Sequence, residues 1–237
     1  MDRQLVSMLF PLETYGQYAF AYNIVTLIST VISSLSLVLF PMLKRMTLDK
    51  AAYYYQRLLE AIVLLLAASL ICYYPFCLFV EWFLPEYAES LIYLKVVLPI
   101  LTFSSGISVV MFTFCKVFDR NVRFFIDGCI ALLATVLFSG VAYWIWRSPL
   151  AISAGSLVAI AIWFVIEAHY LKGIVKVGAG TEFLYLALLA IGFIANTFLV
   201  QQFWLSFAIH ILFYLALTYV FYRKKWKGLV GLVLKKQ

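Results

Sequence analysis

Apolar runs of about twenty residues alternate along the chain with short polar segments. A helix needs about 20 mostly apolar residues to cross the hydrocarbon core of a bilayer. Seven runs meet this length. The predicted spans are Tyr15–Phe40, Leu58–Val80, Leu91–Phe114, Phe124–Trp146, Leu150–Leu171, Phe183–Phe203 and Trp204–Tyr222. The pattern therefore predicts an all-α, polytopic transmembrane helical bundle of about seven spans.

Prolines lie both between the predicted spans and inside them. Breaks in the apolar pattern coincide with Pro41, Pro85 and Pro149. Pro75 and Pro99 fall within spans, where the missing backbone N–H and the bulk of the ring are expected to kink the helix. Neighbouring helices accommodate such kinks in membrane proteins.

The composition is that of an integral membrane protein. Of the 237 residues, 65% are hydrophobic and 12% are charged, and the mean hydropathy is +1.01. Soluble domains lie nearer about 45–50% apolar and about 25% charged. The net charge of +7 does not indicate a nucleic-acid partner, because the basic residues flank apolar runs. No Gly-rich phosphate loop, metal-ligand cluster or nucleophile–base pair is present in the sequence, so neither an enzyme nor a cofactor is expected.

Most of the 18 Lys and Arg residues fall on one side of the predicted membrane. They lie in the segments 41–57, 115–123 and 172–182 and in the tail 223–237. The other side carries an acidic run within residues 81–89. Because cytoplasmic loops are enriched in Lys and Arg, the pattern predicts that Tyr15 lies outside and that the C-terminus lies in the cytoplasm.

The N-terminal segment Met1–Phe10 is mostly apolar but too short to span a bilayer. It precedes Pro11 and a predicted span that begins outside. We interpret it as a partial helix, the outer half of a further span. A short interfacial segment is the alternative.

Polar side chains recur on one face of the first predicted span. Spacings of four and three residues, the period of a helix face, relate Tyr22, Thr26, Ser29 and Ser33. Gln17 and Asn23 lie near the outer end of this face. Small polar residues let transmembrane helices pack closely, which is one explanation. The other is a helix that lines a hydrated cavity, where hydroxyls and amides suit a sugar-bearing ligand.

Charged residues in the predicted spans are expected near the membrane surface. Asp127 lies four residues after Arg123, and Glu167 lies five residues before Lys172, so each carboxylate is expected to pair with its basic neighbour. Arg3, in the N-terminal segment, is the candidate cation that faces a cavity. A guanidinium there suits an anionic lipid phosphate.

Two motifs follow each other in a distinctive order. ETYGQY at 13–18 leads into the polar face and then to LFP at 39–41, and FLPEYAES at 83–90 leads into the segment Leu94–Pro99. Their order and spacing resemble those of polysaccharide (O-antigen type) flippases, which belong to the same superfamily as multidrug exporters. The likeness covers roughly residues 1–172.

The resemblance implies a MATE-like C-terminal lobe. Members of the family have two six-helix bundles, sometimes with two extra helices, and move undecaprenyl-diphosphate-linked oligosaccharides across the bacterial cytoplasmic membrane by alternating access. Residues 1–171 would form the second bundle with its first helix truncated, 172–222 two additional helices, and 223–237 a basic cytoplasmic tail. The early helices of each bundle line the cavity, which carries over to Arg3 and to the polar face.

The family's first bundle has no counterpart in this sequence. The chain is therefore expected to be a fragment, a half-transporter with a separate partner bundle, or a remnant. The expected partners are a lipid-linked oligosaccharide, membrane lipids and the missing N-terminal bundle, with no nucleic acid. The alternative functions are half of a multidrug exporter of the same superfamily and a seven-helix, receptor-like membrane protein.

Overall fold

A computed structural model describes residues 2–234, with side chains described except at 48, 49, 51, 52 and 224–234. Every element in this range is helical. The α-helices are α1 (Asp2–Leu9), α2 (Leu12–Lys44), α3 (Leu48–Ser69), α4 (Tyr73–Phe83), α5 (Leu91–Ser105), α6 (Phe112–Val117), α7 (Asn121–Trp146), α8 (Pro149–Val175), α9 (Gly180–Leu199) and α10 (Phe203–Leu234). Short 3₁₀ segments η1 (Leu70–Cys72) and η2 (Pro85–Ser90) and a π-helical segment η3 (Gly106–Met111) join some of them.

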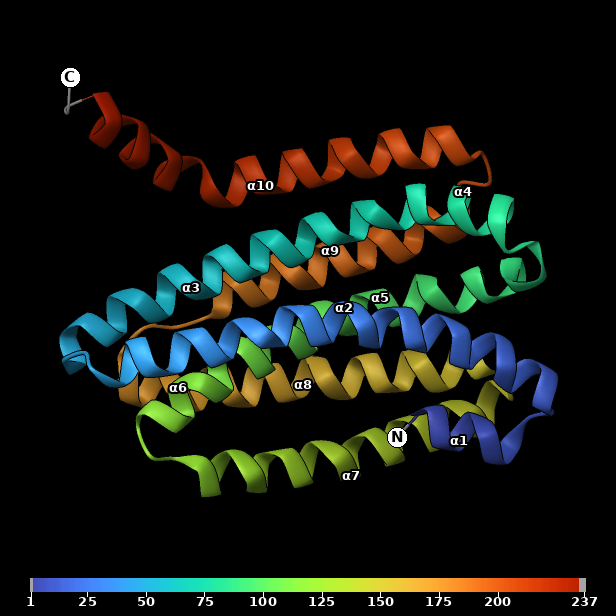
Figure 1. The fold of residues 1–237 in the computed structure, drawn as a ribbon, viewed down its shortest axis with the longest axis horizontal. Helices are drawn as coiled ribbons and strands as arrows, with labels where there is room; N and C mark the ends of the chain where they lie inside the picture. The colour runs from blue at the N-terminus through green and yellow to red at the C-terminus, as the bar shows by residue number, and fades with distance from the viewer. Residues whose placement is uncertain (1, 235–237) are drawn as a thin grey trace.

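The long helices lie side by side in one bundle (Figure 1). α5 lies in the middle and contacts α2, α3, α8 and α9, whereas α7 and α10 lie at opposite edges. Among the described residues, seven stretches are long and apolar enough to cross a membrane. They are Leu12–Lys44, Tyr53–Phe83, Pro85–Val117, Asn121–Trp146, Pro149–Val175, Gly180–Leu199 and Phe203–Arg223. The prediction of an all-α, multi-pass bundle is confirmed.

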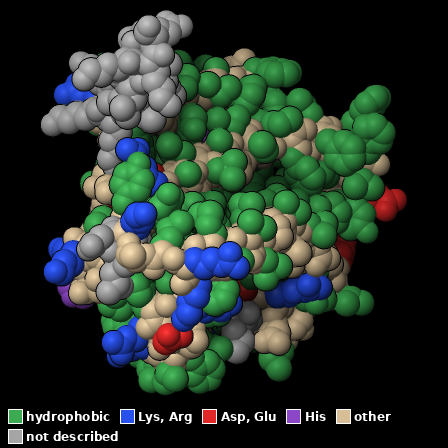
Figure 2. All heavy atoms as spheres, turned by 60° about the vertical axis from the view of Figure 1, so that its left-hand side comes forward, with side chains coloured by type: hydrophobic (Ala, Val, Ile, Leu, Met, Phe, Trp, Pro, Cys, Tyr) green, Lys and Arg blue, Asp and Glu red, His purple; other side chains and the backbone are tan. Residues whose placement is uncertain are grey.

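The two ends of the bundle differ in chemistry. We call the end formed by the α2–α3, α6–α7 and α8–α9 turns the basic end, and Figure 2 shows Lys and Arg side chains gathered there. We call the opposite end the tryptophan end. It carries the exposed side chains of Trp82, Trp144, Trp146 and Trp204. Tryptophan is enriched where a bilayer meets water. The ends therefore have the features of two membrane surfaces.

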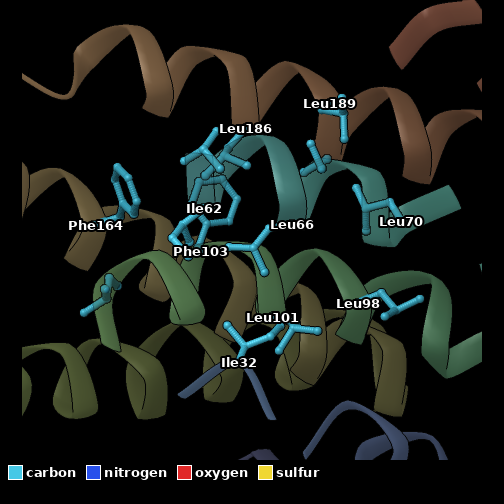
Figure 3. Packing of buried hydrophobic residues seen from close by; sticks show 14 of the residues in the cluster. Ile32, Ile62, Leu66, Leu70, Leu98, Leu101, Phe103, Phe164, Leu186 and Leu189 are labelled. Carbon is cyan, nitrogen blue, oxygen red and sulfur yellow. The ribbon is translucent and has the colours of Figure 1, made fainter. Parts of the chain in front are cut away.

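The core forms around α5. Leu98 and Leu101 of α5 are buried in one cluster with Ile32 of α2, Ile62 and Leu66 of α3, and Leu189 of α9 (Figure 3). Contacts of this kind hold transmembrane helices together by close van der Waals packing, because lipid tails are as apolar as leucine. α5 is accordingly covered by protein along most of its length.

α7 and α8 approach each other closely through small residues. A Cβ placed on Gly155 would lie 2.7 Å from the backbone of Phe138. Nearby, the Ser139 hydroxyl donates to the carbonyl oxygen of Ile152 at 3.0 Å and lies 3.1 Å from the Ser156 hydroxyl. Small residues at such crossings let helix backbones meet and bond across the contact.

The N-terminal segment forms the short helix α1. Figure 1 shows that α1 lies in the half of the bundle nearer the tryptophan end. It packs against α2, α7 and α8, and it buries Asp2 and Val6.

The proline predictions have mixed outcomes. The predicted break at Pro41 is wrong, because α2 continues through it to Lys44. A proline in the last turns of a helix removes one backbone hydrogen bond, and Lys44 ties this end to the α6–α7 turn through Asp119 at 3.0 Å. Pro75 follows the 3₁₀ segment η1, which interrupts the span as expected. Pro99 lies inside α5, which remains α-helical around it.

The turn between the last two spans lies at 200–202, close to its predicted place. α10 extends to Leu234, well beyond the predicted end of the span at Tyr222. The first part of the predicted basic tail is therefore helical. Its residues 235–237, and the side chains at 224–234, lie outside what the structure describes.

Candidate functional site

The polar face of α2 lines a hollow in the bundle. Tyr22, Thr26, Ser29 and Ser33 line it from α2. Val97, Ile100, Leu101 and Ser104 of α5 and Ile160 of α8 form the remaining wall, and the hollow has a volume of about 320 Å³. The four predicted residues therefore line one hollow between α2, α5 and α8.

Two hydroxyls on this face are satisfied within α2 itself. Thr26 donates to the carbonyl oxygen of Tyr22 at 2.9 Å, and Thr30 donates to that of Thr26 at 2.8 Å. Such bonds to the preceding turn let a hydroxyl lie in a membrane helix without a partner from another helix. The face can consequently border an open space at little cost.

Arg3 and Asn23 form a second cluster beside the hollow. The Nη1 group of Arg3 donates to Oδ1 of Asn23 at 3.0 Å, and Nε donates to the hydroxyl of Tyr15 at 3.3 Å. The guanidinium also lies 5.9 Å from the centre of the Tyr15 ring, within the range of a cation–π contact. Arg3 is only half-buried, so its charge remains within reach of a ligand.

Asp2 is a member of this region that the sequence interpretation missed. Its carboxylate is buried and accepts a hydrogen bond from the Tyr18 hydroxyl at 3.1 Å. The same hydroxyl lies 3.0 Å from that of Ser153 on α8, and Tyr22 also lies beside Asp2. α1, α2 and α8 thus meet in one polar cluster. The sequence feature that could have indicated a role for Asp2 is an acidic residue next to Arg3 in an otherwise mostly apolar segment.

Gln17 lies apart from the hollow. Its Nε2 group donates to the backbone carbonyl of Glu86 in η2 at 3.0 Å. The side chain therefore ties the start of α2, at the tryptophan end, to the α4–α5 turn. Of the predicted pathway residues, the structure brings four to the hollow and pairs Arg3 with Asn23, but it places Gln17 in a structural contact.

The predicted interfacial ion pairs have different outcomes. Nε of Arg123 lies 2.9 Å from Oδ2 of Asp127, which confirms the first pair. The second prediction is wrong. Glu167 is fully buried and accepts from Nε1 of Trp163 at 3.2 Å and from the thiol of Cys115. The side chain contacts Trp163, one turn earlier on α8, and Cys115 on α6 instead of Lys172.

The chain matches no family model, no curated protein and no solved structure. The resemblance to flippases therefore rests on the two sequence motifs alone. Residues 13–18 form the first turns of α2, and 39–41 lie in its last turns. Residues 83–90 form the end of α4 and η2. The first motif consequently brackets the helix that lines the hollow.

Proposed function

We propose that this chain forms one half of the translocation pathway of a flippase for undecaprenyl-diphosphate-linked oligosaccharides. The observation that carries the proposal is the hollow of α2 hydroxyls beside the partly exposed guanidinium of Arg3. Hydroxyls suit the hydrogen-bonding groups of sugars. A guanidinium pairs well with phosphate because its fork of N–H donors matches two phosphate oxygens.

The exposed polar side of α2 supports a second bundle as partner. Asn23, Thr26 and Thr30 are exposed on this chain, although they belong to a membrane-spanning helix. Polar groups within a bilayer generally face protein or a water-filled cavity instead of lipid. A MATE-like second lobe, in the same protein or in a separate chain, would complete the cavity on this side.

The proposed setting is the bacterial cytoplasmic membrane, with the basic end in the cytoplasm. For this orientation we expect a cysteine at Glu86 to react with a membrane-impermeant maleimide in intact cells. A cysteine at Arg45 should react only after lysis, because both positions are exposed but lie at opposite ends. The background variant lacks Cys72, Cys77, Cys115 and Cys129. Labelling of Arg45→Cys alone in intact cells would reverse the orientation.

Filling the hollow tests the proposed pathway. We expect Ser29→Leu combined with Ser33→Leu to lower the rate of oligosaccharide-lipid translocation about threefold or more, because leucine replaces both the space and the hydroxyls. The measurement is the appearance of a labelled diphosphate-linked oligosaccharide on the opposite side of membrane vesicles from the native host, which contain any partner bundle.

The matched control is Val31→Leu, on a strongly exposed position of the same helix outside the hollow. Its translocation rate should equal that of the unmodified protein. If the double variant accumulates in the membrane and translocates at the control's rate, the hollow is not the pathway.

A further inference from the structure

A second polar pocket lies at the tryptophan end, between α4, α5, α9 and α10. Its volume is about 590 Å³, and its charged lining consists of Glu81, Glu89 and Lys95. None of these residues belongs to the hollow on α2. The pocket therefore combines two acids and one base at a site that the proposed translocation pathway does not use.

Lys95 is a fixed cation in the wall of this pocket. Its Nζ group donates to the backbone carbonyl of Thr197 at 2.9 Å and lies 4.9 Å from the centre of the Phe198 ring. Thr197 lies in the last turn of α9, where the helix dipole favours a positive charge. An ammonium has three N–H donors, so two remain for a ligand after the carbonyl is bound.

The two carboxylates leave an uncompensated negative charge in the pocket. Glu81 and Glu89 are exposed, and neither makes an ion pair or hydrogen bond with another side chain that the structure describes. Glu81 belongs to α4 and Glu89 to η2, so separate elements present them to one space. A ligand that carries a positive and a negative group would complement this lining.

The pocket lies at the level of lipid headgroups. Trp82 and Trp204, which flank it on α4 and α10, are exposed and mark the interface between bilayer and water. Apolar side chains, including Ile92, Phe198 and Phe203, form the rest of the lining. A soluble zwitterion has no apolar part to pack against this wall, whereas the acyl chains of a lipid can lie along it.

We propose that this pocket binds the headgroup of an ethanolamine phospholipid from the leaflet at the tryptophan end. The lipid phosphate would accept from Lys95, and the primary ammonium would donate to Glu81 and Glu89. A choline headgroup cannot donate such hydrogen bonds, and a glycerol headgroup lacks the positive charge. The inference does not depend on the proposed flippase function, because the site is built from residues outside the pathway.

Lipid binding to the purified full chain tests the proposal. By native mass spectrometry with matched acyl chains, we expect phosphatidylethanolamine to be retained about tenfold more strongly than phosphatidylcholine or phosphatidylglycerol. Soluble O-phosphoethanolamine should not compete at millimolar concentration. Equal retention of the three lipids would overturn the proposal, and competition by O-phosphoethanolamine would replace the lipid with a soluble ligand.

Variants that preserve side-chain shape locate the effect. Glu81→Gln with Glu89→Gln should abolish the preference for phosphatidylethanolamine over phosphatidylglycerol. Glu86→Gln should keep it, because Glu86 lies on the same turn but outside the pocket lining. Lys95→Gln should reduce retention of all three lipids, since all carry the phosphate. A double variant that keeps the full preference would show that the headgroup binds elsewhere.

Discussion

Replacement of Gly155 by leucine is expected to remove most of the folded protein from the membrane. Gly155 faces the backbone of α7, and even a Cβ would lie 2.7 Å from Phe138. Backbone cannot move aside as a flexible side chain can, so α7 and α8 would have to separate. Overpacking of this kind costs about 1–3 kcal/mol for added methylenes, and the separation would also break the Ser139 contacts with α8.

The measurement is the amount of monodisperse protein recovered in mild detergent, followed by fluorescence-detected size exclusion. Gly140→Leu is the matched control, because Gly140 lies on α7 with no atom within 4 Å of a Cβ placed there. It should be recovered at the unmodified level. We expect Gly155→Ala to fall between the two. Equal recovery of both leucine variants would contradict the close approach of α7 and α8.

Replacement of Arg3 by alanine is expected to lower translocation about tenfold or more while leaving the amount of protein in the membrane unchanged. In the proposed pathway, the guanidinium contacts the substrate phosphate. A hydrogen bond to a charged group contributes about 1.5–3 kcal/mol, and about 1.4 kcal/mol corresponds to a factor of ten. The fold loses only the contacts of a half-buried side chain with Tyr15 and Asn23.

The same vesicle assay that tests the hollow measures this effect. Arg3→Lys should give an intermediate rate, because lysine keeps the charge but loses the two-pronged donor geometry. Arg147→Asn is the control, since Arg147 is an exposed arginine at the tryptophan end with a backbone φ of 46°, which asparagine tolerates. Full translocation by Arg3→Ala would remove Arg3 from the proposed pathway.

The number and type of spans could be predicted because the bilayer imposes a length on every crossing helix. The ends of the helices could not. α2 continues past Pro41 to Lys44, whose side chain meets Asp119, 75 residues further along the chain. The contact of Glu167 with Cys115 likewise depends on how α6 meets α8. The sequence around each residue carries no information about such contacts between distant segments.

The candidate site was predictable where it was periodic. The residues at 22, 26, 29 and 33 share a helix face by spacing alone, and they share the hollow. Asp2 gave no periodic signal, because it is a single residue whose role depends on Tyr18 and α8. The close contact at Gly155 could not be predicted either, because a glycine in an apolar helix can face lipid or protein with the same sequence around it.

The central place of α5 has a consequence for biogenesis. A chain enters the membrane from its N-terminal end, so α5 reaches the bilayer before α8 and α9, which cover it in the finished protein. During that interval α8 and α9 do not yet cover the side chains of α5 that they later contact, and Lys95 lacks the carbonyl of Thr197 that it later binds. The native packing around α5 therefore forms after the later helices have inserted. The order in which the helices are synthesised does not by itself determine it. Chains that stop before α9 would display α5 to the membrane's quality-control proteases.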